Sequence, residues 1–127
     1  MKNKIYYENF KDAIERNRKK IPAVHKKLKA AGVQYVMSSW IVLHGIPKTK
    51  PVPMSDFEQL CLGKGPQFAV HSISFVPELT PADSDQIMLP DLDSVYICPW
   101  DKTMAIIFAD LYWEDKPYNV CPRPALK

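Results

Sequence analysis

The chain has 127 residues, of which 46% are hydrophobic and 24% are charged, and its formal net charge is +3. This length fits one globular domain with a modest core, and the composition argues against a disordered chain. No apolar run approaches the roughly eighteen residues that cross a bilayer, and the basic start is not followed by the apolar stretch of a secretory signal. We therefore expect a cytoplasmic location.

The three cysteines, Cys61, Cys98 and Cys121, lie far apart and include no Cys-x-x-Cys pair, and the three histidines are equally scattered. Neither a disulfide framework nor a zinc site is predicted from such a pattern. We expect no metal in this chain, and we expect reduced cysteines that pack as small apolar side chains.

Residues 1–32 form a distinct basic segment, because ten of the seventeen Lys and Arg residues lie at or before Lys29. Apolar positions recur at helical spacing, Pro22 suits the first turn of a helix, and Gly32 suits a left-handed helix end. This predicts two short helices with a break near Ile21. We interpret the basic surface as solvated rather than as a site for nucleic acid or an acidic membrane, because no binding motif is present.

From Val33 the pattern changes to the short apolar runs of strands. Residues 33–37 and 40–43 predict a strand pair or one bent strand, followed by a turn at residues 44–47. Residues 48–53 predict a second strand, which its prolines confine to a sheet edge.

A short helix is expected over residues 56–62, with Ser55 and Glu58 as a reciprocal capping box and Gly63 at its end. Residues 63–81 predict mainly a long loop, which in a compact domain is either functional or mobile. The Gly63-Lys64-Gly65-Pro66 sequence in this loop lacks the remainder of a phosphate-binding motif.

Further strands are predicted at residues 86–89, 94–98 and 104–111, and the last is so continuously apolar that it should be central. A turn follows at residues 114–117. These elements predict an α+β domain with a mixed sheet of four to six strands and a short helix packed on it.

Three acidic pairs have the composition of catalytic carboxylate pairs. Each lies beside Pro, Ser or Lys in a turn-like context, where Asp favours local backbone hydrogen bonds, so we interpret all three as turn residues. The pairs are Asp83 with Asp85, Asp91 with Asp93, and Glu114 with Asp115.

A series of short signatures runs from Val33 to Lys127. They are Tyr35-Val36, Trp40-Ile41-Val42-Leu43-His44-Gly45, residues 48–53, Ser84-Asp85, Leu89-Pro90-Asp91, Pro99-Trp100 and Pro122-Arg123-Pro124-Ala125-Leu126-Lys127. In this order and spacing they resemble the N-terminal β-grasp domain of the glutamine synthetase family. The branch that includes γ-glutamylmethylamide synthetases is the most similar.

The resemblance implies the activity of a larger protein. In the family, ATP phosphorylates the γ-carboxylate of glutamate, and ammonia or an amine displaces the phosphate. ATP, glutamate and magnesium or manganese are held by a C-terminal catalytic domain, which these residues do not resemble, so this chain alone is expected to be inactive.

The resemblance also implies a division of the chain and a set of partners. Residues 33–127 would be the β-grasp domain, preceded by the basic helical segment 1–32. Its partners would be glutamine synthetase-type catalytic domains or subunits in a ring-shaped homo-oligomer. The alternative is a free-standing, non-catalytic β-grasp module that binds or regulates a partner.

By the resemblance, residues 40–45 form a loop that enters the active site of a neighbouring subunit. The family pattern is Phe-x-Asp-x-x-Gly, whose aspartate binds ammonium and helps to remove its proton. Trp40 and Gly45 match the outer positions, and Val42 stands where the aspartate would be. Either the site takes a bulkier or less polar amine, or the loop has lost its catalytic part and Val42 packs, or the alignment is slightly shifted. His44 is either a substitute base or a turn residue.

A second departure concerns Phe68-Ala69-Val70-His71-Ser72, where ammonia-using members have Phe-Asp-Gly-Ser-Ser. Both missing acids argue against ordinary ammonia as the substrate. The resemblance places Ser84-Asp85 and Leu89-Pro90-Asp91 at structural positions near the active-site rim.

Aromatic side chains predict a contact with another chain, because a domain of this size cannot bury all of them. They are Trp100, Trp113 and Tyr112, with Tyr6 and Tyr7.

Overall fold

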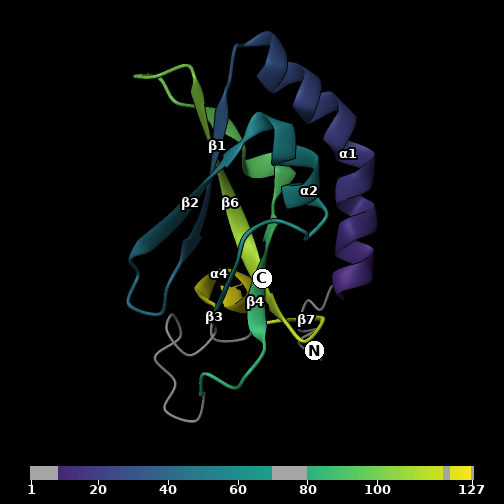
Figure 1. Ribbon diagram of the computed structural model, residues 1–127, viewed down its shortest axis with the longest axis vertical. Coiled ribbons are helices and arrows are strands. Elements are labelled where there is room, and N and C mark those ends of the chain that lie inside the picture. Colours follow the sequence, from purple (N-terminus) through teal and green to yellow (C-terminus); the bar gives the residue numbers. More distant parts are fainter. Residues whose placement is uncertain (1–8, 70–79, 119–120, 127) are drawn as a thin grey trace, which may run out of the picture.

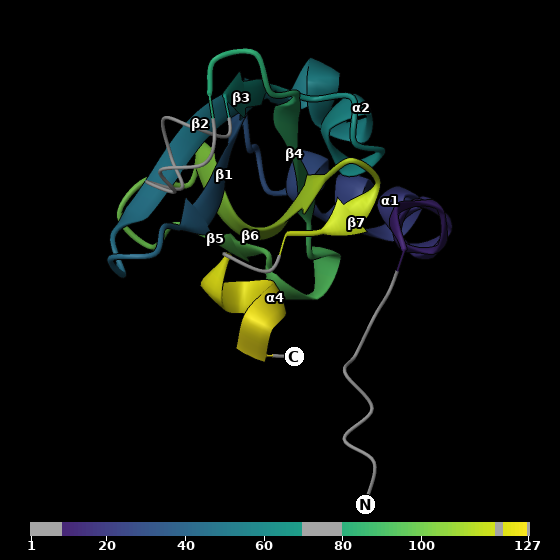
Figure 2. The same ribbon diagram turned by 90° about the horizontal axis from the view of Figure 1, so that it is seen from below.

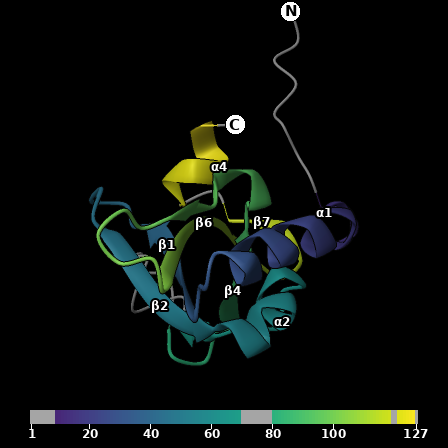
Figure 3. The same cartoon turned by 90° about the horizontal axis from the view of Figure 1, so that it is seen from above.

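A computed structural model describes residues 9–69, 80–118 and 121–126. The long helix α1 (Phe10–Ala30) runs beside a curled sheet, with α2 (Phe57–Cys61) between them, and α4 (Pro122–Leu126) lies on the opposite side of the sheet (Figures 1, 2 and 3). Two short 3₁₀ turns, η1 (Met54–Asp56) and η2 (Leu92–Ser94), complete the helical elements of the described residues.

The sheet has the strand order β2-β1-β6-β4-β3, with β1 and β6 parallel and the other pairs antiparallel. Its strands are β1 (Tyr35–Ile41), β2 (Pro47–Pro53), β3 (Gln67–Ala69), β4 (Asp85–Pro90) and β6 (Met104–Trp113). Two-residue strands β5 (Tyr96–Ile97) and β7 (Lys116–Pro117) also pair with β6. The α+β class and the mixed sheet are confirmed, with five strands on the main path.

Strand β6 is central, as its apolar sequence predicts. It pairs with β1, β4, β5 and β7, and its alternate residues Ala105, Ile107 and Ala109 are fully buried. Phe57 and Leu60 of α2 are equally buried and belong to the same core as Ile107. The core therefore lies between the concave side of the sheet and helices α1 and α2.

The prediction of two N-terminal helices with a break near Ile21 is wrong, because α1 is continuous and Pro22 lies inside it. Proline costs a helix interior about 3 kcal/mol or more, since it cannot donate a backbone hydrogen bond. Burial offsets this cost. Ile21 and Leu28 face the core, and the side-chain amide of buried Asn17 donates to the carbonyls of Cys61 and Pro90 at 2.9 and 3.0 Å.

The left-handed helix end is confirmed. Gly32 has a φ of +83°, and the amides of Gly32 and Val33 donate to carbonyls in the last turn of α1. Gly63, which ends α2, has a φ of +74°.

The capping box at Ser55 and Glu58 is wrong. The chain already turns in η1, so Ser55 lies within a helical turn, and the N-cap positions of η1 and α2 have no side-chain cap bond within the described residues. The N-cap of α2 is Asp56.

The long loop predicted at residues 63–81 is interrupted by β3, which pairs with β4. Three residues were too few to give a strand pattern in the sequence. The apolar cluster Ile73-Ser74-Phe75-Val76 lies outside the described residues. The strand predicted at residues 94–98 is shorter than expected, because η2 occupies its first residue and only β5 remains extended.

Candidate functional site

The β1–β2 hairpin carries the residues singled out by the sequence. Residues 33–43 give one strand, β1, rather than a pair, and β2 forms a sheet edge as its prolines predict. The amide of Val42 donates to the carbonyl of Ile46 at 3.1 Å, and the amide of Gly45 donates to the carbonyl of Val42 at 2.8 Å. Gly45 has a φ of +78°, a conformation that favours glycine, so the turn at residues 44–47 is confirmed.

The structure separates the four candidate site residues into two pairs. Trp40 and Val42 are each 3% exposed and belong to the hydrophobic core, whereas His44 and Gly45 are exposed at the turn. The two-residue period of a strand places Val36, Trp40 and Val42 on the core side. His44 has the same parity, but it lies in the turn beyond the end of β1 and is exposed. Val42 therefore packs in the hydrophobic core, as the interpretation that assigns it a packing role proposes.

Two exposed residues at the tip escaped the sequence analysis. Leu43 is 56% exposed and Ile46 is 52% exposed, on either side of His44 and Gly45. The sequence could have predicted the exposure of Leu43, because consecutive strand residues alternate between faces and Leu43 follows core-facing Val42. The hairpin therefore presents an apolar tip to solvent.

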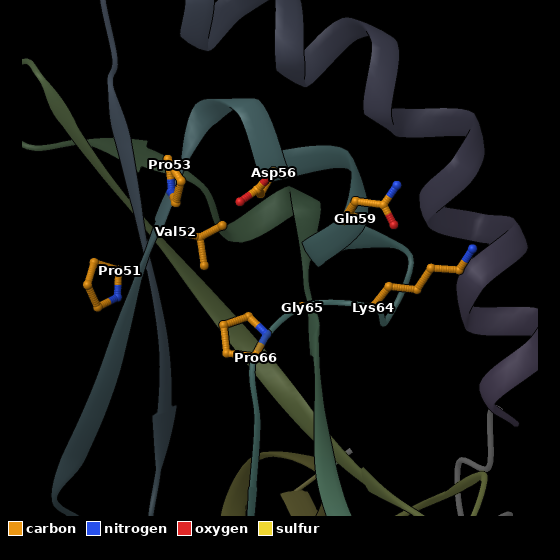
Figure 4. A pocket seen from close by; sticks show the side chains of 8 residues that line it. All are labelled: Pro51, Val52, Pro53, Asp56, Gln59, Lys64, Gly65 and Pro66. Atoms are coloured by element: carbon orange, nitrogen blue, oxygen red, sulfur yellow. The ribbon is translucent and has the colours of Figure 1, made fainter.

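A hollow of about 370 Å³ lies between β2 and the loop that follows α2 (Figure 4). Figure 4 shows the Asp56 carboxylate at its rim and the Lys64 side chain extending away from it. The remaining lining is mostly apolar and comes from Pro51, Val52, Pro53, Gln59, Gly65 and Pro66.

The loop beside this hollow is held in place by close backbone approaches. A Cβ on Gly63 would meet the Phe10 ring at 2.5 Å, and one on Gly65 would meet the Leu60 side chain at 2.8 Å. The amide of Lys64 donates to the carbonyl of Gln59 at 2.9 Å. The glycines in this loop therefore serve close packing.

The acidic pairs sit in turns as expected, except that Asp85 is the first residue of strand β4. Asp83 accepts the Thr80 amide at 2.6 Å, and Glu114 and Asp115 form the β6–β7 turn with φ values of +51° and +63°. Asp91 caps η2 by accepting the Asp93 amide at 3.0 Å.

Arg123 of α4 joins one of these carboxylates, Asp91, to Asp110, a contact that sequence reasoning missed. Its guanidinium donates to Asp91 at 2.6 Å and to Asp110 of β6 at 2.8 Å. Burial would lower the pKa of Arg123, but the hydrogen bonds that it donates to the two carboxylates outweigh this effect, and the pKa is raised. The network fastens α4 to the sheet.

The predicted aromatic surface is only partly exposed. Trp100 is 74% exposed, whereas Tyr112 is 4% exposed and Trp113 packs edge-on against Tyr118. Tyr6 and Tyr7 lie outside the described residues. Exposed apolar surface is supplied instead by Tyr35 and Tyr96, at 48% and 43%.

Cys61, Cys98 and Cys121 are buried and free of disulfides. Within residues 9–69, 80–118 and 121–126, no group of three or more His, Cys, Asp or Glu side chains is arranged to hold a metal ion. In the same part of the chain, no helix is long and apolar enough to cross a membrane.

The mixed sheet, with its parallel central pair and a helix packed in its concave side, defines a β-grasp type of domain. No protein-family model matches the chain. Among curated proteins, a glutamine synthetase from Rhizobium meliloti (strain 1021) is 38% identical over 96 residues, which are 76% of this chain and 21% of that protein. A glutamate–methylamine ligase from Methyloversatilis universalis is 28% identical over 102 residues, covering 79% of this chain and 22% of that protein.

Solved structures agree. GmaS without ligand matches with a TM-score of 0.73 and 26% identity, over 80% of this chain and 24% of that one. GmaS in complex with ADP matches with the same score and identity, over 81% and 23%. The chain belongs to the glutamine synthetase family, as a counterpart of its N-terminal domain. It spans about a fifth of the length of the curated relatives that it matches.

Proposed function

We propose that this chain is the N-terminal domain of a glutamine synthetase-type, ATP-dependent ligase that joins glutamate to an amine or ammonia, and thus serves nitrogen metabolism. Its role is to place the β1–β2 hairpin, residues 40–45 with the adjoining Ile46, at the amine side of a neighbouring subunit's active site. In this proposal, ATP and magnesium or manganese belong to the catalytic domain of the larger protein.

The observation that carries the proposal is the construction of the hairpin. Its base is anchored in the core through Trp40 and Val42, while Leu43 and Ile46 project apolar surface into solvent. Apolar surface at a fixed tip is suited to insertion into another chain. The similarity to a glutamate–methylamine ligase supports an amine-binding context for that contact.

The amine preference follows from what the hairpin lacks. Neither Trp40 nor Val42 can accept a proton, and a carboxylate is absent from residues 40–45. We therefore propose an alkyl or aryl amine as the preferred substrate, with the apolar tip near the amine's substituent. His44 is the one titratable side chain in this stretch and remains the candidate for a substitute base.

The test mixes the purified 127-residue chain with the catalytic domain of its parent synthetase. Assembly size is followed by light scattering, and γ-glutamyl amide formation is followed across ammonia, methylamine and bulkier amines. We expect activity only in the mixture, with alkylamines ahead of ammonia. Assembly without activity would replace the proposal with the regulatory module, and a mixture that prefers ammonia would refute the amine preference.

A matched pair of variants sharpens this test. Leu43→Ser combined with Ile46→Ser should abolish activity in the mixture if the tip enters the neighbour's site. Lys102→Ser, at an exposed position outside the hairpin, should leave it unchanged. Equal activity in both variants would show that the tip contributes nothing.

A further inference from the structure

A groove runs along α1, on the side that faces η1 and α2. Two hollows of about 340 and 510 Å³ both have His25 in their lining, so they adjoin at this residue. The first is bounded by Arg18, Pro22 and Glu58, and the second by Lys29, Gln34 and Ser55. Figures 1 and 3 show α1 and α2 side by side.

The wall formed by α1 is basic. Arg18, His25 and Lys29 line the groove, and their spacing of seven and four residues places them on one face of the helix. Within the lining of the two hollows, Glu58 is the only carboxylate, and it lies at the Arg18 end. Arg18 already pairs with Glu15 at 3.2 Å. The Lys29 end is therefore the one that attracts an anion.

The Lys29 end also supplies hydrogen-bonding groups and an apolar floor. Ser55 and Gln34 are exposed polar side chains, whereas Val33 is 6% exposed and Met54 packs against the core. A cation with neutral donors around it suits a carboxylate, because charge-assisted hydrogen bonds are the stronger ones. The adjacent apolar side chains suit a small aliphatic group beside that carboxylate.

The shape of the groove favours a chain segment over a compact ligand. A helix rises about 1.5 Å per residue, so His25 and Lys29 lie about 6 Å apart along its axis. Side chains on one face of an extended peptide repeat every 6.4–6.8 Å, roughly the same spacing. Carboxylates two positions apart on an extended strand can thus meet both residues together.

We propose that this groove binds an acidic, extended peptide segment of a partner protein. Two carboxylates of the segment, separated by one aliphatic residue, contact His25 and Lys29, and the aliphatic side chain between them points away from α1, toward the wall that includes Met54. This site is separate from the hairpin and does not depend on the proposed ligase function.

The test uses the 127-residue chain and a fluorescein-labelled peptide with the sequence Gly-Ser-Glu-Val-Glu-Ser-Gly, followed by fluorescence anisotropy. The neutral peptide with Gln in place of Glu is the first control. We expect saturable binding of the acidic peptide and at least about tenfold weaker binding of the neutral one, the scale of one lost charge-assisted contact. Absence of saturable binding by the acidic peptide would overturn the proposal.

The helix supplies a matched pair of variants. Lys29→Gln removes a groove cation, whereas Lys26→Gln removes the same charge from an exposed position that lines neither hollow. We expect about five- to tenfold weaker binding for Lys29→Gln and less than about twofold for Lys26→Gln. If both variants weaken peptide binding equally, the attraction comes from the overall basic charge of the helix, and the assigned site would be overturned.

Two further measurements separate the alternatives. Glu58→Gln removes the one carboxylate of the lining and should tighten binding about twofold, a gain that unfolding cannot produce. A single-stranded oligonucleotide should not displace the peptide at equal phosphate and carboxylate concentration. If the oligonucleotide does displace the peptide, and if Lys26→Gln and Lys29→Gln weaken this displacement equally, the basic surface would be assigned to nucleic acid instead.

Discussion

The base and the tip of the β1–β2 hairpin are built from similar apolar residues that meet different surroundings. Val42 is 3% exposed and packs in the core, while its neighbour Leu43 is 56% exposed. The strand period decides this difference, because consecutive side chains point to opposite faces. A substitution at residue 42 therefore tests folding, and a substitution at residue 43 tests contact with another chain.

The same contrast separates two sets of ion pairs. Arg123 meets Asp91 and Asp110 with side chains that are 8–26% exposed, whereas Lys20 meets Asp93 at 2.6 Å with side chains that are 39% and 73% exposed. Short distance alone does not make a pair stabilising, since water screens the exposed one. We expect the Arg123 network to matter for stability and the Lys20 pair to matter little.

The largest expected effect tests the difference in burial between Val42 and Leu43. Val42→Asp places a carboxylate in the core and should lower the free energy of unfolding by about 3–5 kcal/mol. Leu43→Asp places the same group in solvent and should change it by less than about 0.5 kcal/mol. Urea unfolding of both variants measures this, and equal losses would show that Val42 does not pack as described.

The second effect concerns Arg123→Ala, which leaves the Asp110 carboxylate buried without its cation. We expect a loss of about 2–3 kcal/mol, below the range for fully buried pairs because these side chains are partly exposed. Lys20→Ala should cost less than about 1 kcal/mol. Similar losses for the two variants in urea unfolding would contradict the contrast between the pairs.

The pH dependence of the Arg123 contribution has a definite sign. The pKa of Arg123 is raised above its ordinary, strongly alkaline value, so the guanidinium is charged in both folded and unfolded chains at neutral and mildly alkaline pH. Its contribution is fully present below this value and is lost only as the pH rises further. The difference between wild type and Arg123→Ala should therefore be constant from neutral to mildly alkaline pH.

A third effect appears in alkali. Burial, with a smaller contribution from the charge of Glu58, raises the pKa of Cys61 from 9.0 to about 12. The unfolded thiol ionises first, so unfolding releases a proton and the free energy of unfolding falls as the pH rises from 9.0 toward 12. At one pH unit above 9.0, the free energy of unfolding is lower by about 1.4 kcal/mol than at neutral pH.

A control variant isolates this thiol from the other groups that titrate in alkali. Burial also raises the pKa of Cys121, so part of the slope belongs to that residue. Cys61→Ala should flatten the fall in unfolding free energy between mildly and strongly alkaline buffers. An unchanged slope would mean that the Cys61 thiol is not sheltered from water.

The smallest effect on folding is expected at the tip. Leu43→Ser combined with Ile46→Ser should change the free energy of unfolding of the isolated chain by less than about 0.5 kcal/mol, because both side chains are already more than half exposed. A large loss in thermal or urea unfolding would show that the tip is part of the fold and not a surface for another chain.

Local patterns predicted much of this fold. The apolar run in residues 104–111 predicted the central strand, the prolines of residues 48–53 predicted an edge strand, and Gly32 predicted a left-handed helix end. The order of short signatures predicted the family, which the relatives confirm. In each case the physical cause acts within a few residues along the chain.

Two of the errors have a common cause in contacts between residues that are distant in sequence. Pro22 is tolerated inside α1 because Asn17 donates to carbonyls of α2 and β4 and Ile21 is buried in the core. The three residues of β3 are extended because β4 is beside them. Ser55 fails to cap α2 because η1 starts the turn earlier. The partners of α1 and β3 are distant in sequence, whereas η1 directly precedes α2.

By itself the sequence determined the fold class, the hairpin and the family, because these depend on periodicity, turn chemistry and the order of signatures. Only the tertiary structure decided which hairpin residues are buried, that Arg123 joins Asp91 to Asp110, and that Arg18, His25 and Lys29 line a groove. Burial and ion pairing depend on which distant elements meet, and that is fixed only when the sheet curls around its core.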